Sequence, residues 1–185
     1  AFPGITKMVS EGGLGFDYKW NMGWMNDTLS YIKTDPVFRN YHHNKLTFQL
    51  TYVFSEQYVL PLSHDEVVHM KGSMINKMPG EYDQKFSSLK SYYTYMMTHP
   101  GKKLLFMGGE IGQFREWSES RELDWSVLDY DSHKGLQNYV KTLNHLYKEH
   151  PCLYENEKNW DGFKWISVDD KDHNVLAYER ISSNG

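Results

Sequence analysis

A short apolar run, residues 58–62 (Tyr-Val-Leu-Pro-Leu), ends abruptly in four polar or ionisable residues, Ser63-His64-Asp65-Glu66. The run is too short for a helix, and it is apolar enough to form a strand that is buried on both faces. In barrels of alternating strands and helices, the chemistry takes place at the carboxyl ends of the strands. We therefore predict that His64 and Asp65 line an active site.

A capping interpretation of the same stretch stays open. Ser63 and Glu66 have the spacing of a capping box, which would start a helix through Val67 and Val68. A helix cap and an active site can share one loop. The capping interpretation is therefore compatible with the catalytic one.

A metal-site interpretation is disfavoured by helix geometry. The residues His64, Asp65, Glu66 and His69 resemble a scrambled His-Glu-x-x-His zinc motif. Residues four apart on a helix lie about 40° from one another, whereas residues five apart diverge by about 140°. The two histidines would then point in different directions, so we expect no metal here.

Composition narrows the function classes. The chain has 185 residues, 39% of them hydrophobic and 16% aromatic, and a net charge of -4 with both signs interspersed. We expect no binding of nucleic acid or of an anionic membrane. The single Cys152 and the lack of a signal peptide or a long apolar run favour a cytoplasmic protein. The chain begins with Ala1 rather than Met, and we expect both of its ends to be cut.

Strand-like and helix-like segments alternate along the chain. Strands are predicted over residues 14–20, 58–62 and 102–107, helices over 22–34, 46–54, 81–99 and 133–150, and a β-hairpin over 163–168 and 175–178. This order predicts an α/β fold with a parallel sheet and crossover helices. Three units cannot close an eight-stranded barrel, so two architectures stay open: a small doubly wound domain and the later part of a barrel.

Three blocks of sequence carry a family resemblance. They are Gly-Gly-Leu-Gly-Phe-Asp-Tyr-Lys-Trp-Asn-Met-Gly-Trp-Met-Asn-Asp at residues 12–27, Leu-Pro-Leu-Ser-His-Asp-Glu-Val-Val-His at 60–69 and Gly-Lys-Lys-Leu-Leu-Phe-Met-Gly-Gly-Glu at 101–110. In this order they resemble bacterial glycogen (1,4-α-glucan) branching enzymes, which belong to the α-amylase superfamily. The resemblance covers nearly the whole chain. One departure is Met70, where the family leads us to expect Gly.

The resemblance implies a fold and a place in the family's chain. Residues 1–152 would form the later strands and helices of a (β/α)8 TIM barrel, its C-terminal portion. Residues 153–185 would begin an all-β C-terminal domain. The family's aspartate nucleophile and glutamate acid/base would lie upstream of this chain. A partial barrel leaves unpaired strand edges, so we expect the isolated chain to be poorly stable.

The resemblance also implies roles for particular residues. The pair His64-Asp65 matches the family's third acidic residue and the His before it, so Asp65 would stabilise the transition state and His64 would bind sugar hydroxyls. Glu110 and Trp117 are weaker candidates for substrate binding. For Trp20 we expect buried packing instead. The chemistry requires no cofactor and no metal.

The implied activity is that of a branching enzyme. The full-length protein would cleave an α-1,4-glucan such as glycogen or amylose and transfer the segment to a 6-hydroxyl, creating an α-1,6 branch by a retaining mechanism. The 185 residues alone are expected to be inactive. Two alternatives stay open: an inert glucan-binding fragment, and part of a related amylase-type hydrolase.

Overall fold

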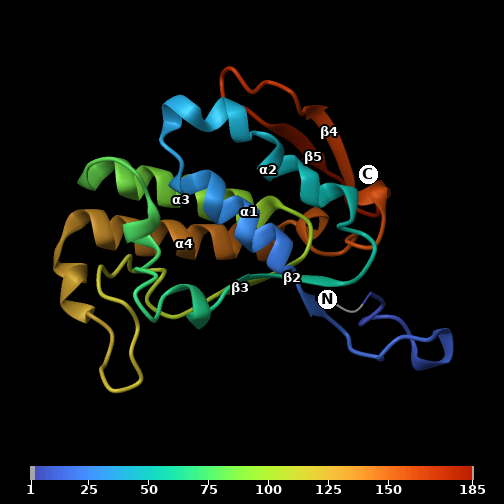
Figure 1. Ribbon diagram of the computed structural model, residues 1–185, viewed down its shortest axis with the longest axis horizontal. Coiled ribbons are helices and arrows are strands. Elements are labelled where there is room, and N and C mark those ends of the chain that lie inside the picture. Colours follow the sequence, from blue (N-terminus) through green and yellow to red (C-terminus); the bar gives the residue numbers. More distant parts are fainter. Residues whose placement is uncertain (1–2, 185) are drawn as a thin grey trace.

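The structure, a computed structural model, describes residues 3–184 (Figure 1). Its helices are α1 (Met22–Lys33), α2 (Asn44–Thr47), α3 (Tyr82–Thr98) and α4 (Asp131–Glu149). Its strands are β1 (Lys19–Trp20), β2 (Tyr58–Leu62), β3 (Lys102–Leu105), β4 (Phe163–Ser167) and β5 (Ala177–Arg180). Short 3-10 turns connect several of these elements, among them His64–Glu66 directly after β2.

The first three strands form one parallel sheet in the order β1-β2-β3. Lys19 pairs with Tyr58, and Val59 pairs with Lys102. Helix α1 connects β1 to β2 and helix α3 connects β2 to β3, which confirms the predicted alternation with crossover helices. The predicted strand at residues 58–62 has the bounds that the structure shows.

The core lies between this sheet and three helices. Figure 1 shows α1, α3 and α4 together on one side of β2 and β3. Leu60 and Leu62 of β2 are fully buried there, beside Trp24 of α1 and Leu89 of α3. Burial of such side chains contributes roughly 1.5–3 kcal/mol each to folding. The helices are therefore held by the apolar side chains of the sheet.

Two helix starts have side-chain caps. The Oδ1 atom of Asn21 accepts a hydrogen bond from the Trp24 backbone N–H at 2.9 Å, so Asn21 caps α1. Glu81 and Gln84 form a reciprocal capping box at the start of α3. The first cap starts α1 directly after β1, and the second starts α3 after the long loop that follows β2.

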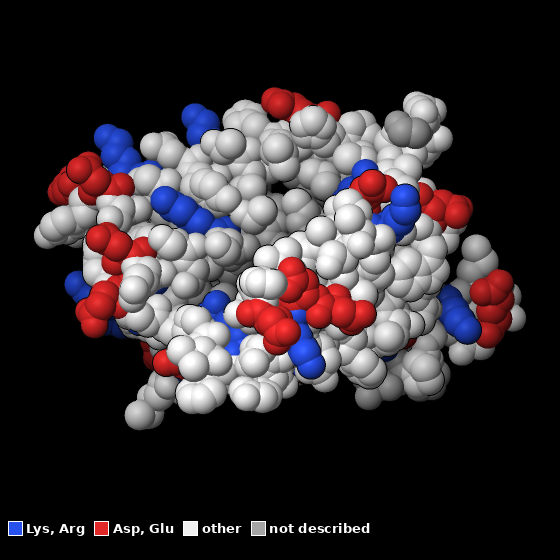
Figure 2. Space-filling model, turned by 90° about the horizontal axis from the view of Figure 1, so that it is seen from above, with Lys and Arg blue, Asp and Glu red and all other residues white. Residues whose placement is uncertain are grey.

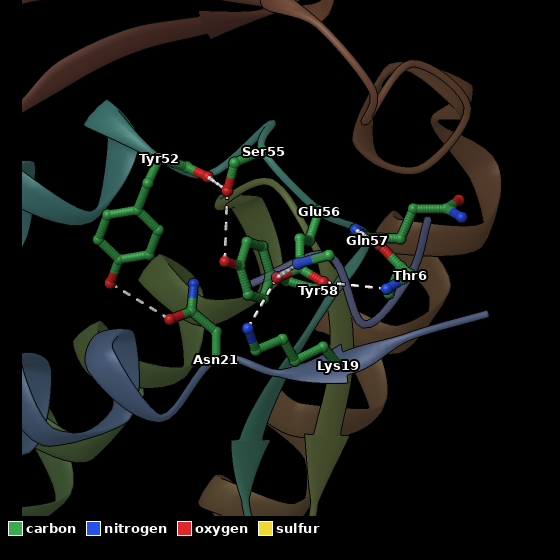
Figure 3. A network of polar contacts seen from close by, with 9 residues as sticks. Thr6, Lys19, Asn21, Tyr52, Ser55, Glu56, Gln57 and Tyr58 are labelled. Atoms are coloured by element: carbon green, nitrogen blue, oxygen red, sulfur yellow. Dashed lines mark hydrogen bonds and ion pairs between the residues drawn. The ribbon is translucent and has the colours of Figure 1, made fainter. Parts of the chain in front are cut away.

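At the amino end of the sheet, a buried carboxylate joins three segments. Glu56 accepts a hydrogen bond from the Lys19 ammonium at 2.7 Å and from the backbone N–H groups of Gly4 and Thr6 (Figure 3). These bonds keep its pKa below the usual range although burial opposes the shift. Glu56 thus fixes the N-terminal segment and β1 against the start of β2.

The last two strands form an antiparallel hairpin with an irregularity between Trp165 and Ser167. The hairpin packs on the helical layer: the hydroxyls of Tyr178 and Thr98 lie 2.6 Å apart, and the Arg180 guanidinium donates to the Thr98 carbonyl at 2.8 Å. The predicted hairpin is confirmed, with its second strand about two residues later than predicted.

Three local predictions of secondary structure are wrong. The helix expected over residues 46–54 is instead a single α-helical turn, Asn44–Thr47, followed by a 3-10 turn, Phe48–Thr51. The strand expected over residues 14–20 comprises only Lys19–Trp20, because Gly15 has a left-handed φ of 74° and donates its N–H back to the Lys7 carbonyl. The capping box at Ser63 does not form: the Ser63 side chain makes no capping hydrogen bond, and the 3-10 turn ends at Glu66 without continuing into a helix.

The surface carries charges of both signs. On the face seen in Figure 2, acidic and basic side chains lie in small neighbouring groups. Within residues 3–184, no helix has the length and apolar character needed to cross a membrane.

Candidate active site

The carboxyl ends of the three parallel strands meet at one edge of the sheet. Asn21 follows β1, Ser63 follows β2 and Phe106 follows β3. Backbone hydrogen bonds extend the pairing to this edge, from the Asn21 N–H to the Val59 carbonyl at 2.8 Å and from the Phe106 N–H to the Leu62 carbonyl at 2.9 Å. The residues that follow these positions are therefore held on the framework of the sheet.

His64 and Asp65 stand at this edge with their side chains half exposed. The His64 Nε2 atom lies 3.2 Å from the Asp65 Oδ1 atom, and the exposed fractions of the two side chains are 50% and 54%. The preceding Ser63 is buried, so the chain leaves the core immediately before the pair. A carboxylate and an imidazole that touch each other and face solvent can both reach the hydroxyls of a bound sugar.

An aromatic row extends from His64. Its ring contacts Phe106 with centroids 5.8 Å apart, and Phe106 contacts Trp117 edge-on at 5.2 Å. The Trp117 N–H also donates to the Val67 carbonyl at 3.0 Å. The structure thus brings Trp117 to the same edge as His64, through a residue, Phe106, that the sequence did not single out.

Glu110 lies in a different place. It lines a hollow of about 550 Å³ between β3 and α4, together with Met97, Lys103 and Val140. Its role in substrate binding stays a prediction. Trp20, expected to be buried, is 42% exposed at the end of β1. The expectation for Trp20 is wrong: it ends a two-residue strand at the edge of the sheet and lies outside the buried core cluster.

Sequence reasoning missed the groups that hold the loop after Asp65. The Lys71 ammonium donates to the Asp65 carbonyl at 2.7 Å and lies 3.9 Å from the Glu66 carboxylate. The side chain of Glu116, from the loop after β3, accepts hydrogen bonds from the backbone of the 69–72 turn. No pattern in the sequence specifies these contacts, and the unexpected Met70 marks only where the turn lies.

No group of three or more His, Cys, Asp or Glu residues that could hold a metal ion occurs among residues 3–184. The acidic and histidine side chains near β2 instead have partners of other kinds. Asp65 pairs with His64, and Glu66 pairs with Lys71.

Comparison with known proteins gives strong similarity to one kind of enzyme. The chain is 56% identical over all its 185 residues to the 1,4-alpha-glucan branching enzyme GlgB of Halothermothrix orenii, of which it covers 29%. It is 54% identical over 181 residues to the enzyme of the same name from Shewanella frigidimarina, covering 24%, and 53% identical over 185 residues to that of Aquifex aeolicus, covering 29%. No family model matches the chain.

A solved structure supports the fold. The structure of the chain resembles the crystal structure of an alpha-amylase from H. orenii with a TM-score of 0.54 and 17% sequence identity, over 91% of this chain and 37% of that one. The chain spans 24% to 29% of the length of the relatives quoted above and aligns with their C-terminal part. The resemblance seen in the sequence is thereby confirmed: over its whole length, this chain is similar to a C-terminal segment of bacterial 1,4-alpha-glucan branching enzymes.

Proposed function

We propose that the chain is a segment of a glycogen branching enzyme, in which residues 1–152 are the later part of a (β/α)8 barrel and residues 153–185 begin an all-β domain. The observation that carries the proposal is the pair His64-Asp65, half exposed at the carboxyl edge of a parallel sheet. Identities of 53% to 56% with branching enzymes support it.

In this proposal Asp65 stabilises the transition state. A retaining transfer passes through oxocarbenium-like transition states on either side of a covalent glycosyl intermediate. A fixed carboxylate beside the developing positive charge lowers the barrier by preorganised electrostatics. His64, 3.2 Å from Asp65, orients that carboxylate and hydrogen-bonds a sugar hydroxyl. Trp117 supports this edge through Phe106 and offers an apolar face to the glucan.

The nucleophile and the general acid/base come from outside residues 1–185 in this proposal, so no residue of the chain takes either role. The sequence identity with branching enzymes favours transfer to a glucan hydroxyl, rather than hydrolysis, as the reaction. The branching enzymes share more than half of the chain's residues, whereas the likeness to the alpha-amylase is one of fold. The substrate is an α-glucan such as glycogen or amylose.

A chimera tests the proposal. Residues 1–185 replace the matching segment of the branching enzyme of Halothermothrix orenii, and the chimera is incubated with amylose. We expect α-1,6 linkages, measured by proton NMR, without an equivalent release of reducing ends. Reducing ends without branches would instead indicate a hydrolase. Branching by the isolated 185 residues would contradict the proposal, because the nucleophile and acid/base would then lie within them.

A further inference from the structure

The turn that follows the His64-Asp65 pair has an unusual backbone. His69 and Met70 have left-handed φ values of 56° and 66°, and Gly72 has a φ of 77°. Residues other than Gly seldom adopt this conformation, and two in succession are rarer still. Such a conformation persists only where the surrounding structure enforces it. Residues 69–72, the left-handed turn, therefore need an external restraint.

Glu116 supplies that restraint from the loop after β3. Its Oε2 atom accepts a hydrogen bond from the Met70 N–H at 3.0 Å, and its Oε1 atom accepts one from the Gly72 N–H at 2.6 Å. One carboxylate thus binds the backbone N–H groups of the residues directly before and after Lys71. The same two bonds hold the pKa of Glu116 below its usual range, so the carboxylate stays charged at neutral pH.

A buried lysine closes the other side of the left-handed turn. Lys77 is only 6% exposed, and its ammonium donates to the carbonyls of Lys71 at 2.7 Å and Gly72 at 2.6 Å. The donor groups of the left-handed turn face an anion and its acceptor groups face a cation. The turn is therefore held from both sides by charge-assisted hydrogen bonds.

The left-handed turn connects directly to the candidate site. Lys71, at its centre, donates from its ammonium to the Asp65 carbonyl at 2.7 Å. A second connection comes from Trp117, the residue after Glu116. Its backbone N–H donates to the Val67 carbonyl. Hydrogen bonds from Glu116 and Trp117 thus join the loop after β3 to the loop after β2 on both sides of His69.

We propose that Glu116 is a positioning residue that holds the left-handed turn and, through Lys71, sets the position of Asp65 against the glucan. The proposal rests on the proposed function, because it assigns Asp65 a part in glucan transfer. Glu116 does not serve its own loop in this way: the partners of its carboxylate are both in the left-handed turn, whereas Arg115 and Asp124 form an ion pair within the loop after β3.

The test compares Glu116→Ala and Glu116→Gln with the control Glu119→Ala in the chimera described above. Glu119 has the same charge, lies in the same loop and is exposed, with no hydrogen bond or ion pair to the described residues. Hydrogen exchange of the peptide covering residues 64–72 and the kcat and KM for branching of amylose are measured for each variant.

We expect Glu116→Ala to speed exchange in residues 69–72 at least tenfold and to lower kcat at least tenfold, with KM changed less than threefold. Glu116→Gln keeps one acceptor oxygen and should lie between Ala and the wild type. Glu119→Ala should change neither quantity. Adding Met70→Gly to Glu116→Ala should recover at least threefold of the lost kcat, because Gly adopts the left-handed conformation without the steric cost.

Different outcomes separate this proposal from the proposed function. A wild-type chimera without branching activity would contradict the proposed function. An active wild-type chimera whose kcat is unchanged by Glu116→Ala would contradict only the positioning role. Unchanged exchange in residues 69–72 would contradict the restraint itself. A lower melting temperature with normal kcat would reduce Glu116 to a structural residue and would also overturn the proposal.

Discussion

The two ends of the parallel sheet are built differently. At the carboxyl end, His64 and Asp65 are half exposed and contact each other. At the amino end, ionisable groups are buried or bound to the backbone: His99 is 1% exposed, and Glu157 accepts one hydrogen bond from the Gly101 N–H and pairs with Lys102 at 2.8 Å.

The most strongly lowered pKa values of basic groups lie at the end of the sheet opposite the candidate site. Burial lowers the pKa of His99 to about 3 and holds the pKa of Lys103 well below its usual range. His99 precedes β3 and Lys103 is its second residue, so both lie toward the amino end of the strand, whereas Phe106 follows its carboxyl end. The buried surroundings of His99 and Lys103 favour a structural role. In a fold of this kind, the carboxyl ends of the strands indicate a candidate catalytic site better than shifted pKa values do.

Acid should affect the amino end most strongly. The folded chain keeps His99 neutral down to about pH 3, whereas the unfolded chain protonates it near pH 6.5. Between these pH values the unfolded state binds one proton more than the folded state. The contribution of neutral His99 to the free energy of unfolding is therefore fully present above pH 6.5 and decreases as the pH falls, by about 4–5 kcal/mol at pH 3. Denaturant unfolding from pH 7 to pH 3, with His99→Gln for comparison, measures this loss. Equal pH dependence in both proteins would contradict it.

A substitution at Gly101 should have the next largest effect. Gly101 has a φ of 113°, and an added Cβ would lie 3.2 Å from Leu60 Cδ2 and 3.3 Å from the Tyr58 carbonyl oxygen. We expect Gly101→Ala to reduce the free energy of unfolding by about 2–4 kcal/mol. Gly135→Ala, in helix α4, is the control. Its added Cβ would have one near neighbour among the described residues, Lys90 Nζ at 4.0 Å, so the variant should be as stable as the wild type or more stable. Equal thermal unfolding of the two variants would contradict the prediction.

The smallest effect concerns the carboxyl end. Met70 is 96% exposed with a φ of 66°, so its side chain adds strain and almost no burial. Met70→Gly should raise the free energy of unfolding by about 0.5–1 kcal/mol. It removes the steric cost of a left-handed φ, about 1–2 kcal/mol. Part of this gain is lost because Gly gives up more conformational entropy on folding. Met70→Ala removes the same side chain but keeps Cβ, so its stability should not change. If Ala stabilises as much as Gly, backbone strain is not the cause.

Sequence patterns predicted the elements that depend on local signals. The strand at residues 58–62 was predictable because its signal, a short apolar run that ends in polar residues, lies within a few residues of the chain. The strand 14–20 failed because Gly15 turns the chain back toward Lys7, a contact that hydrophobic alternation does not report.

The candidate site was predictable only in part. His64 and Asp65 follow β2 directly, so strand polarity located them. The contact between Glu116 and the Gly72 N–H joins residues 44 apart, and no pattern in the sequence specifies it. The unexpected Met70 marked the position of the left-handed turn, but its φ became apparent only in the structure.

One measurement tests most directly whether the carboxyl end carries the chemistry and the amino end the stability. Asp65→Asn and Gly101→Ala are made in the chimera, and the branching rate on amylose and the unfolding temperature are measured for both. We predict that Asp65→Asn lowers the branching rate at least about 10²-fold with an unchanged unfolding temperature. Gly101→Ala should lower the unfolding temperature and leave the branching rate of the folded protein intact. A folded Asp65→Asn variant that branches amylose at the wild-type rate would contradict the account.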